Sequence, residues 1–301
     1  MPITRGQIAR ELVPGLNALF GLEYAKYAEE HKQIFKTESS DKAYEEEVKL
    51  SGFGAAPVKP EAESIQFDEA GELYTSRYTH ETIALGFAIT EEAFEDNLYD
   101  SLSNRYTRAL ARSMAHTKQV KAAAVLNRAF DTLYKGGDGQ PLISATHPLS
   151  VGVISNISDK DLSEAALEEA IGKIGQWTDD RGLLIAAQAR KLIVPPGPSS
   201  FEAARILQSE YRPGTADNDI NVISTNGLIP EGWVTNHYLT DPDSWFLTTD
   251  IPNGLKHFQR VPIKNTSEGD FDTGNMRYKS RERYSFGWSD PLAIFGSPGA
   301  P

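Results

Sequence analysis

The sequence has no cysteine among its 301 residues. Without thiolates the chain cannot form disulfides, sulfur-ligated zinc sites, iron–sulfur clusters or a cysteine nucleophile. It also has no continuous apolar run of about 20 residues, the length that crosses a bilayer, so no membrane contact is expected. Basic residues are in the minority, since 30 lysines and arginines stand against 42 acids and leave a net charge of −12. A general nucleic-acid binder needs a basic surface that displaces counterions from phosphates, so strong binding of nucleic acid is not expected.

Motifs for metal binding and catalysis are missing as well. None of the six histidines forms an HxxxH or HExxH pair, so no zinc site is expected. No GxSxG elbow places a nucleophilic serine, although a Ser–His–Asp triad assembled only in space stays open. The segment KGGDGQP (135–141) has glycines but lacks the Lys-Ser/Thr of a phosphate-binding loop. The sequence therefore predicts neither an enzyme nor a cofactor or metal site.

A cluster of acids precedes a long helical segment. In TEEAFEDNLYD (90–100), Thr90 is followed by Glu91, Glu92, Glu95, Asp96 and Asp100. Two carboxylates can serve as catalytic acid and base when their surroundings push their pKa values apart. Threonine, however, is a favoured helix N-cap, and acids in the first turn interact well with the helix dipole. We therefore interpret these acids as helix-starting residues and not as a catalytic pair.

Apolar spacing and turn residues predict an α+β fold. Prolines and glycines mark the expected breaks between elements. The expected helices are two short ones within 7–35 that break at Pro14-Gly15, one at 91–100, a long one from a bend at 100–103 to about Tyr134, one over 163–177 capped by Ser163, and a serine-capped one in 199–211. The expected short strands are 189–196, 220–225, 232–239 and 245–249.

Two long hairpins are also expected. Extended flanks around a tip rich in glycine and proline predict one hairpin over residues 42–88, with too little apolar content for a core of its own. Ordering such a projection is costly unless burial offsets the lost entropy, so we expect a neighbouring subunit to cover it. The second hairpin spans 255–288 and turns at the polar tip SEGDFDTGN (267–275).

The second hairpin holds two groups of charged residues. Its tip has spaced acids, but an EF-hand requires Gly at position six and Glu at position twelve, where this chain has Asn275 and Arg281. We therefore interpret the tip as a polar turn and not as a calcium site. Lys279, Arg281 and Arg283 alternate along one strand face. Such a face can contact phosphate, but contact with acidic residues of a neighbouring subunit is the favoured interpretation.

The order of these elements resembles a tailed-bacteriophage major capsid protein with the HK97-type fold, and is most similar to the Mu-type major head subunit family. Four segments, found in the family's order, carry the resemblance over nearly the whole chain. They are FKTESSDKAYEEEVKLSGFG (35–54), GFAITEEAFEDNLYD with RYTRALARSMAHTKQVKAAAVLN (86–100 and 105–127), KLIVPPGPSSFEAARIL (191–207), and RYKSRERYSFGWSDPLAIFG (277–296).

The resemblance implies a division of the chain and a set of contact residues. The implied parts are an N-terminal arm (1–41), an extended loop (42–88), a peripheral domain with the spine helix (89–136 and 251–286), and an axial domain (137–250 and 287–301). The implied contacts between subunits are Phe53, Lys59, Ile65, Phe67 and Tyr74 in the extended loop, Glu268, Asp270, Phe271, Asp272 and Asn275 at the tip near three-fold positions, and the basic face of Lys279, Arg281 and Arg283.

The function that the resemblance implies is self-assembly. Hexamers and pentamers would close an icosahedral head around double-stranded DNA, in the virion and, during assembly, in the host cytoplasm. The expected partners are other copies of the chain, a phage portal, and a separate scaffolding protein, because the chain begins directly at the arm. Packaged DNA would be touched only weakly, since an acidic lining does not hold a polyanion. Two alternatives stay open: an encapsulin-type cellular shell protein and a soluble acidic α+β enzyme.

Overall fold

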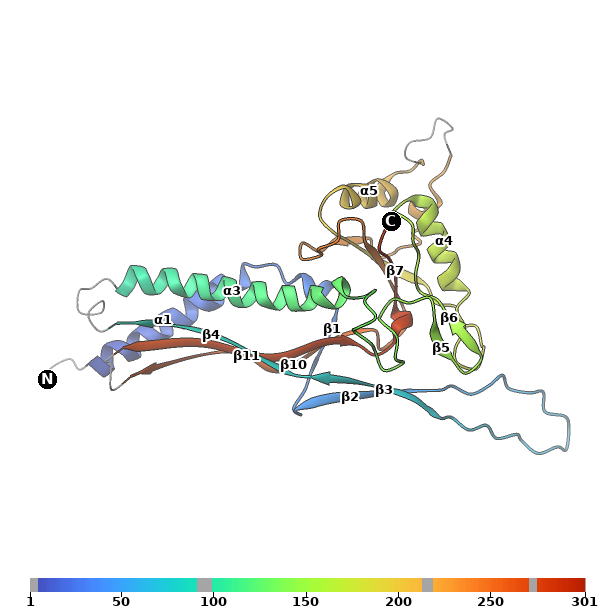
Figure 1. Ribbon diagram of the computed structural model, residues 1–301, viewed down its shortest axis with the longest axis horizontal. Helices are drawn as coiled ribbons and strands as arrows, with labels where there is room; N and C mark the ends of the chain where they lie inside the picture. The colour runs from blue at the N-terminus through green and yellow to red at the C-terminus, as the bar shows by residue number, and fades with distance from the viewer. Residues whose placement is uncertain (1–4, 91–98, 213–218, 271–274, 301) are drawn as a thin grey trace.

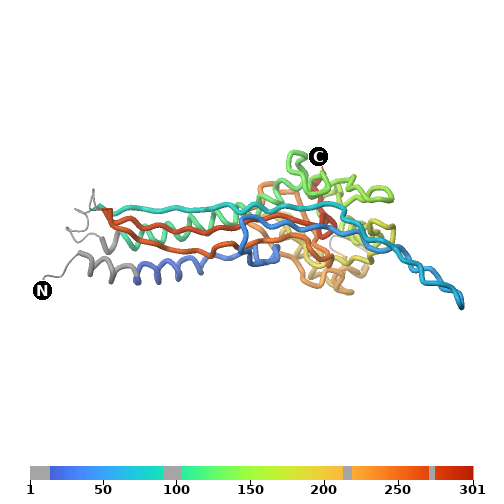
Figure 2. The backbone as a smooth tube through the Cα atoms, turned by 90° about the horizontal axis from the view of Figure 1, so that it is seen from below, coloured from blue at the N-terminus to red at the C-terminus, as the bar shows by residue number. Residues whose placement is uncertain are grey.

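The computed structural model describes residues 5–90, 99–212, 219–270 and 275–300. Figure 1 shows an elongated part, in which two helices lie along a long sheet, and a compact part around the C-terminus. A two-stranded arm leaves the junction between them and runs past the compact part. Figure 2, seen from below, shows that the long sheet and the arm follow one axis. The fold class is α+β, as the sequence predicts.

The elongated part is built on a four-stranded sheet with the order β1-β10-β11-β4. β1 runs parallel to β10, and the other neighbours are antiparallel. Its strands are β1 (Lys36–Ser39), β10 (Leu255–Gly269), β11 (Met276–Trp288) and β4 (Glu81–Ile89). The second expected hairpin is therefore confirmed as β10 and β11, with its turn between Gly269 and Met276.

Helices α1 (Arg5–Ala25) and α3 (Tyr99–Asn127) cover one face of this sheet. A core cluster forms where α1, α3 and β11 meet, and includes Leu16, Phe20, Leu110, Met114 and Tyr278. The expected break at Pro14-Gly15 is wrong, because α1 continues through Pro14. An interior proline costs a helix about 3 kcal/mol, and burial of two to three large side chains at about 1.5–3 kcal/mol each offsets that cost. After α1, a short 3-10 helix, η1 (Glu30–Gln33), leads into β1.

The spine of the elongated part is one unbroken helix. α3 has 29 residues, about 43 Å at 1.5 Å per residue, and continues through 100–103 without interruption, while residues 91–98 of the expected short helix lie outside the described residues. The expected bend came from following large apolar residues at every fourth position, but two of those, Tyr106 and Val120, are exposed. The buried stripe is instead regular, and it is made largely of alanine and polar residues. Its members are Ser103, Thr107, Leu110, Ala111, Met114, Ala115, Lys118, Gln119, Ala122, Ala123 and Leu126.

α3 also ends earlier than expected, at Asn127 and not near Tyr134. The Asn127 side chain donates to the carbonyl of Tyr238 (3.1 Å) and accepts from the backbone N–H of Thr240 (3.1 Å). These bonds tie the end of the helix to the compact part. Glu91, Glu92, Glu95 and Asp96 lie outside the described residues, while Asp100 belongs to the first turn of α3.

The compact part surrounds a second four-stranded sheet with the order β12-β9-β7-β8. Three of the four expected short strands are confirmed, although β8 is shorter than expected. The strands are β7 (Ala189–Val194), β8 (Trp233–Thr235), β9 (Trp245–Thr249) and β12 (Ile294–Ser297), and a small hairpin adds β5 (His147–Leu149) and β6 (Gly152–Ile154). The helices are α4 (Glu164–Gly175), α5 (Pro198–Gln208) and α6 (Val222–Thr225), with the 3-10 turn η2 (Pro291–Ala293).

Helix N-caps in the compact part agree with the sequence at α4 and differ from it at α5 and α6. Ser163 caps α4 as expected, and its hydroxyl accepts from the backbone N–H of Ala166 (3.2 Å). The serine cap expected for α5 is wrong, since Gly197 occupies the N-cap with a φ of 129° that favours glycine. The strand expected at 220–225 is also wrong. There the Asn221 side chain accepts from the N–H groups of Ile223 and Ser224, which starts the short helix α6.

The arm is a hairpin of β2 (Tyr44–Leu50) and β3 (Glu72–Thr79). Residues 51–71 continue beyond the strands without regular secondary structure. The strand pair is therefore shorter than the 42–88 hairpin expected from sequence. β4 turns away after His80 and pairs with β11 in the long sheet, because Ile83, Phe87 and Ile89 pack toward the helices there.

Two buried histidines join η1 to the long sheet. The rings of His31 and His257 lie 5.2 Å apart, edge to face, and His257 stacks on Phe286 at 4.4 Å. Burial, with a smaller contribution from Lys118, lowers the pKa of His31 to about 4 and that of His257 to about 3. Both rings are therefore neutral in the folded chain near pH 7.

The lowered pKa values of His31 and His257 predict that the folded chain loses stability at acidic pH. Unfolded histidine titrates near pH 6.5, so below that pH the unfolded chain binds more protons and stability is lost as pH falls toward the folded pKa. We expect each histidine to account for about 2 kcal/mol of lost stability at pH 5. Urea unfolding of the unassembled chain at pH 7.5 and pH 5 measures the loss. His31→Phe should reduce it, and His116→Phe, at an exposed position of α3, should not; an equal loss in both variants would contradict the assignment.

Candidate assembly surfaces

The distal arm, which is residues 51–71 beyond the strands β2 and β3, exposes large apolar side chains. Phe53 is 62% exposed, Ile65 66%, Val58 93% and Phe67 96%. Lys59 is exposed as well, whereas Tyr74 is half-buried at the root of the arm. Burying a side chain of this size contributes about 1.5–3 kcal/mol. Four of the five extended-loop residues expected to contact another subunit are therefore exposed in the single chain. Tyr74 is the exception.

The root of the arm is fixed to the C-terminal end of β11 by polar contacts. The hydroxyl of Tyr78 hydrogen-bonds the hydroxyl of Ser289, and Tyr74 donates to the Ser289 carbonyl (3.4 Å). Glu47 of β2 pairs with the buried Lys256, and Lys49 pairs with Asp290 at 2.8 Å. These contacts set the direction in which the distal arm projects.

Two glycines allow strand β3, at the root of the arm, to lie close to the segments that hold Gly137 and Gly287. A Cβ at Gly287 would lie 2.8 Å from the Tyr78 ring, and one at Gly137 would lie 2.6 Å from the Tyr74 ring and 2.9 Å from the Thr75 carbonyl. Such distances are shorter than van der Waals contact. Neither glycine could be given this role from the sequence, because a close approach between distant segments leaves no local pattern.

The turn between β10 and β11 lies at the opposite end of the molecule from the distal arm (Figure 1). Glu268 is exposed, and Asp270 forms an ion pair with Arg277. The backbone N–H of Asp270 donates to the carbonyl of Asn275 (2.8 Å), which closes the turn. Phe271 and Asp272 fall outside the described residues.

The expected alternation on β11 is present. Lys279 and Arg281 are exposed, while Tyr278, Ser280 and Glu282 between them are buried. The basic residues therefore lie on the sheet face that α1 and α3 do not cover. Arg283 continues this face, is half-buried, and donates to the Ala43 carbonyl (3.5 Å). Lys264, which pairs in register with Arg281 and is exposed, extends the basic face onto β10.

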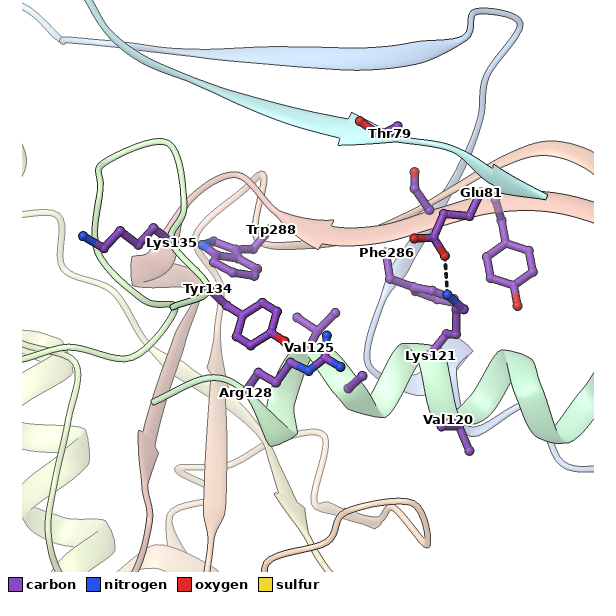
Figure 3. Close-up of a pocket in the computed structure, with 13 residues that line it drawn as sticks. Thr79, Glu81, Val120, Lys121, Val125, Arg128, Tyr134, Lys135, Phe286 and Trp288 are labelled. Carbon is purple, nitrogen blue, oxygen red and sulfur yellow. Dashed lines mark hydrogen bonds and ion pairs between the residues drawn. The ribbon is translucent and has the colours of Figure 1, made fainter. Parts of the chain in front are cut away.

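A pocket that the sequence analysis missed lies at the root of the arm (Figure 3). It has a volume of about 460 Å³ and opens between the last turns of α3, the corner between β3 and β4, and the end of β11. Apolar side chains form its wall, among them Val120, Val125, Tyr134, Phe286 and Trp288. Its members come from four separate segments, so only the tertiary structure brings them together.

One buried polar cluster, around His147, links segments of the compact part. His147 hydrogen-bonds Asp138 (2.6 Å) through Nδ1 and Asn156 (3.0 Å) through Nε2. The Asn156 amide in turn donates to three backbone carbonyls, so the group ties β5 to the C-terminal strand. Among the described residues, no three side chains of His, Asp or Glu converge on a possible metal position. Within those same ranges, no helix is long and apolar enough to cross a membrane.

Comparison with known proteins gives one family and one fold. The family model described as "Phage capsid protein" matches residues 72–296, well over half of the chain. The capsid of the cyanophage P-SCSP1u aligns with 88% of this chain and 86% of its own at a TM-score of 0.58 and 10% identity. A virus-like particle from Pyrococcus furiosus aligns over 94% and 98% at a TM-score of 0.55 and 11% identity. At such identities the likeness shows the fold alone, and no protein with a curated description matches the sequence.

Proposed function

The chain belongs to the phage capsid protein family and has the HK97-type fold, and from this we propose that it is the major head protein, with hexamers and pentamers closing an icosahedral shell around double-stranded DNA. Proteins of this family build the shell of the virion, so the chain is a structural protein and not an enzyme. The same family match favours a phage capsid over an encapsulin-type cellular shell.

The distal arm is the observation that carries the proposal. A hairpin that exposes four large apolar side chains and extends beyond its own core is unfavourable in an isolated chain. Its burial by another copy removes that cost and supplies a driving force for assembly. The basic face of Lys279, Arg281 and Lys264 and the turn with Glu268 and Asp270 supply further contacts between copies.

The proposed division of the chain follows the same family. Residues 1–41 form the N-terminal arm and 42–88 the extended loop, with β4 contributing to the long sheet. Residues 89–136 and 251–286 form the peripheral domain around α3, and 137–250 and 287–301 the axial domain. The four matching sequence segments support a relation to the Mu-type major head subunits.

Further partners complete the proposal. A phage portal and a separate scaffolding protein would act with this chain in the host cytoplasm. DNA would touch the shell only through weak, non-specific contacts, because a chain of net charge −12 does not retain a polyanion.

Negative-stain microscopy of the purified full chain, with light scattering, tests the shell. We expect closed particles or rings of subunits, with the yield of closed particles rising when the scaffolding protein is co-expressed. A uniform monomer or dimer at high concentration, unchanged by scaffold or crowding agents, would contradict the proposal.

A further inference from the structure

The loop between α3 and β5 supports the root of the arm. It lies against β3, since a Cβ at Gly137 would come within 2.6 Å of the Tyr74 ring. One buried pair closes the loop: His147 Nδ1 lies 2.6 Å from a carboxylate oxygen of Asp138, and the two side chains are 3% and 2% exposed. The pair therefore holds the surface on which β3 rests, and the distal arm continues from β3.

The second ring nitrogen of His147 faces an oxygen whose identity is fixed. Nε2 lies 3.0 Å from Oδ1 of Asn156. The other partners of this amide set its orientation, because its nitrogen donates to three backbone carbonyls and its oxygen accepts from the backbone N–H of Ser144 (2.8 Å). An amide oxygen has no hydrogen to donate. Nε2 of His147 must therefore carry a proton.

The contact with Asp138 requires a second proton. A lone pair on Nδ1 that pointed at a carboxylate oxygen 2.6 Å away would be repelled by it. A neutral imidazole has a single N–H, and Nε2 already uses it. The other oxygen of Asp138 accepts from the backbone N–H of Gln140 (3.1 Å), which suits an ionised carboxylate. The hydrogen bonds thus describe an imidazolium paired with a carboxylate.

The groups around the pair connect it to the root of the arm. Burial and the negative charges of Asp290 and Asp138 raise the pKa of the Tyr74 hydroxyl, so Tyr74 keeps its proton at neutral and mildly alkaline pH. Asp290 is itself paired with Lys49 of β2 (2.8 Å). Histidine is the side chain whose charge ordinarily changes near neutral pH. His147 is therefore the group at this contact from which a proton can leave as pH rises.

We propose that Asp138 and His147 form a clasp held by a proton, which fixes the loop between α3 and β5 against β3, and that losing this proton at alkaline pH loosens the root of the arm. The clasp itself is a property of the single chain. Its consequence for assembly rests on the proposed function, since the arm is the part that meets neighbouring copies.

The direction of the pH dependence follows from counting protons. An unfolded histidine loses its second proton near pH 6.5, so above that pH the clasped chain binds one proton more than the opened chain. The contribution of the clasp is fully present below pH 6.5 and decreases as pH rises, by up to about tenfold in the opening equilibrium for each pH unit. This direction is opposite to that of His31 and His257, which lose stability toward acidic pH.

Asp138→Asn separates the hydrogen bonds from the proton. The new amide nitrogen can donate to Nδ1 of a neutral His147, so this variant closes the clasp without an additional proton. Hydrogen–deuterium exchange of the unassembled chain at pH 7 and pH 9, corrected for intrinsic exchange rates, measures opening of β3. We expect protection of β3 to fall at least about tenfold in the unaltered chain and to stay constant in Asp138→Asn, with α4 unchanged in both. Equal falls in the two chains, or no fall in the unaltered chain, would overturn the clasp.

The spectrum of the ring nitrogens tests the protonation directly in the unaltered chain. Nitrogen-15 chemical shifts of labelled histidine distinguish a protonated ring nitrogen from a bare one. We expect His147, identified by the signals that His147→Gln lacks, to keep both ring nitrogens protonated at pH 7.5. His116, at an exposed position of α3, should be neutral there. A bare nitrogen on His147 at pH 7.5 would overturn the proposal. Both measurements use unassembled chains, so their failure is distinct from a failure to form shells.

Discussion

Replacing residues 53–69 by Asn-Gly should abolish closed particles. The change removes Phe53, Val58, Ile65 and Phe67, whose burial between copies would contribute about 1.5–3 kcal/mol each. Each copy loses this contribution at every contact, so we expect the particle yield to fall at least a hundredfold. Sedimentation and negative-stain microscopy, under conditions in which the unaltered chain assembles, measure the yield.

The deletion should leave the subunit folded. Ser51 and Gly71 close the strand pair through the bond from the Ser51 N–H to the Gly71 carbonyl (2.8 Å) and that from the Gly71 N–H to the Ser51 hydroxyl (2.9 Å). The deletion lies beyond these bonds, and Asn-Gly is a favoured turn for a short hairpin. The free energy of unfolding of the unassembled chain, measured in urea, should therefore change by less than about 1 kcal/mol. Ser64→Ala, at an exposed polar position of the same segment, serves as a control that assembles normally, and normal shells from the deletion variant would contradict the role of the arm.

Lys118→Met should cost about 3–5 kcal/mol of folding stability, because it breaks a buried ion pair. Lys118 Nζ lies 3.1 Å from a carboxylate oxygen of Glu282, with side chains 7% and 1% exposed. Burial raises the pKa of Glu282, and the charge of Lys118 opposes that rise. Without Lys118 the carboxyl is left buried without its cation, and taking up a proton there limits but does not remove the cost.

Two further variants make this prediction specific. Lys121→Met, on the same helix, breaks an exposed pair with Glu81, whose side chains are 40% and 58% exposed. Exposed pairs contribute about 0–1 kcal/mol. The free energy of unfolding of Lys121→Met should therefore stay within about 1 kcal/mol of that of the unaltered chain. Lys118→Met with Glu282→Leu removes both charges and should regain most of the loss. Urea unfolding of the unassembled chains compares them, and equal losses for Lys118→Met and Lys121→Met would contradict the assignment.

Local patterns in the sequence predicted the elements whose cause is local. Ser163 caps α4 because its hydroxyl reaches an N–H only three residues away. The alternation of Lys279, Arg281 and Arg283 predicted that they share one strand face, since successive side chains of a strand point to opposite sides. The long hairpin over 42–88, with too little apolar content for a core of its own, already indicated contact with a neighbouring subunit. The order of four segments identified the type of fold.

Long-range packing decided the rest. α3 buries Ser103, Thr107 and Ala111 against the sheet, and no local rule distinguishes these small residues from exposed ones. β4 leaves the arm because β11 offers it an edge. The pairing of Lys118 with Glu282 spans 164 positions, and the pocket of Figure 3 draws on four segments.

The sequence by itself thus determined composition, charge, most strands and helices, and the open apolar character of the arm, because each depends on residues close together in the chain. The tertiary structure alone decided where the arm is anchored, which glycines allow that approach, and where aromatic and cationic side chains meet. Those features depend on contacts between distant segments, whose free energy is gained only when the whole chain has folded.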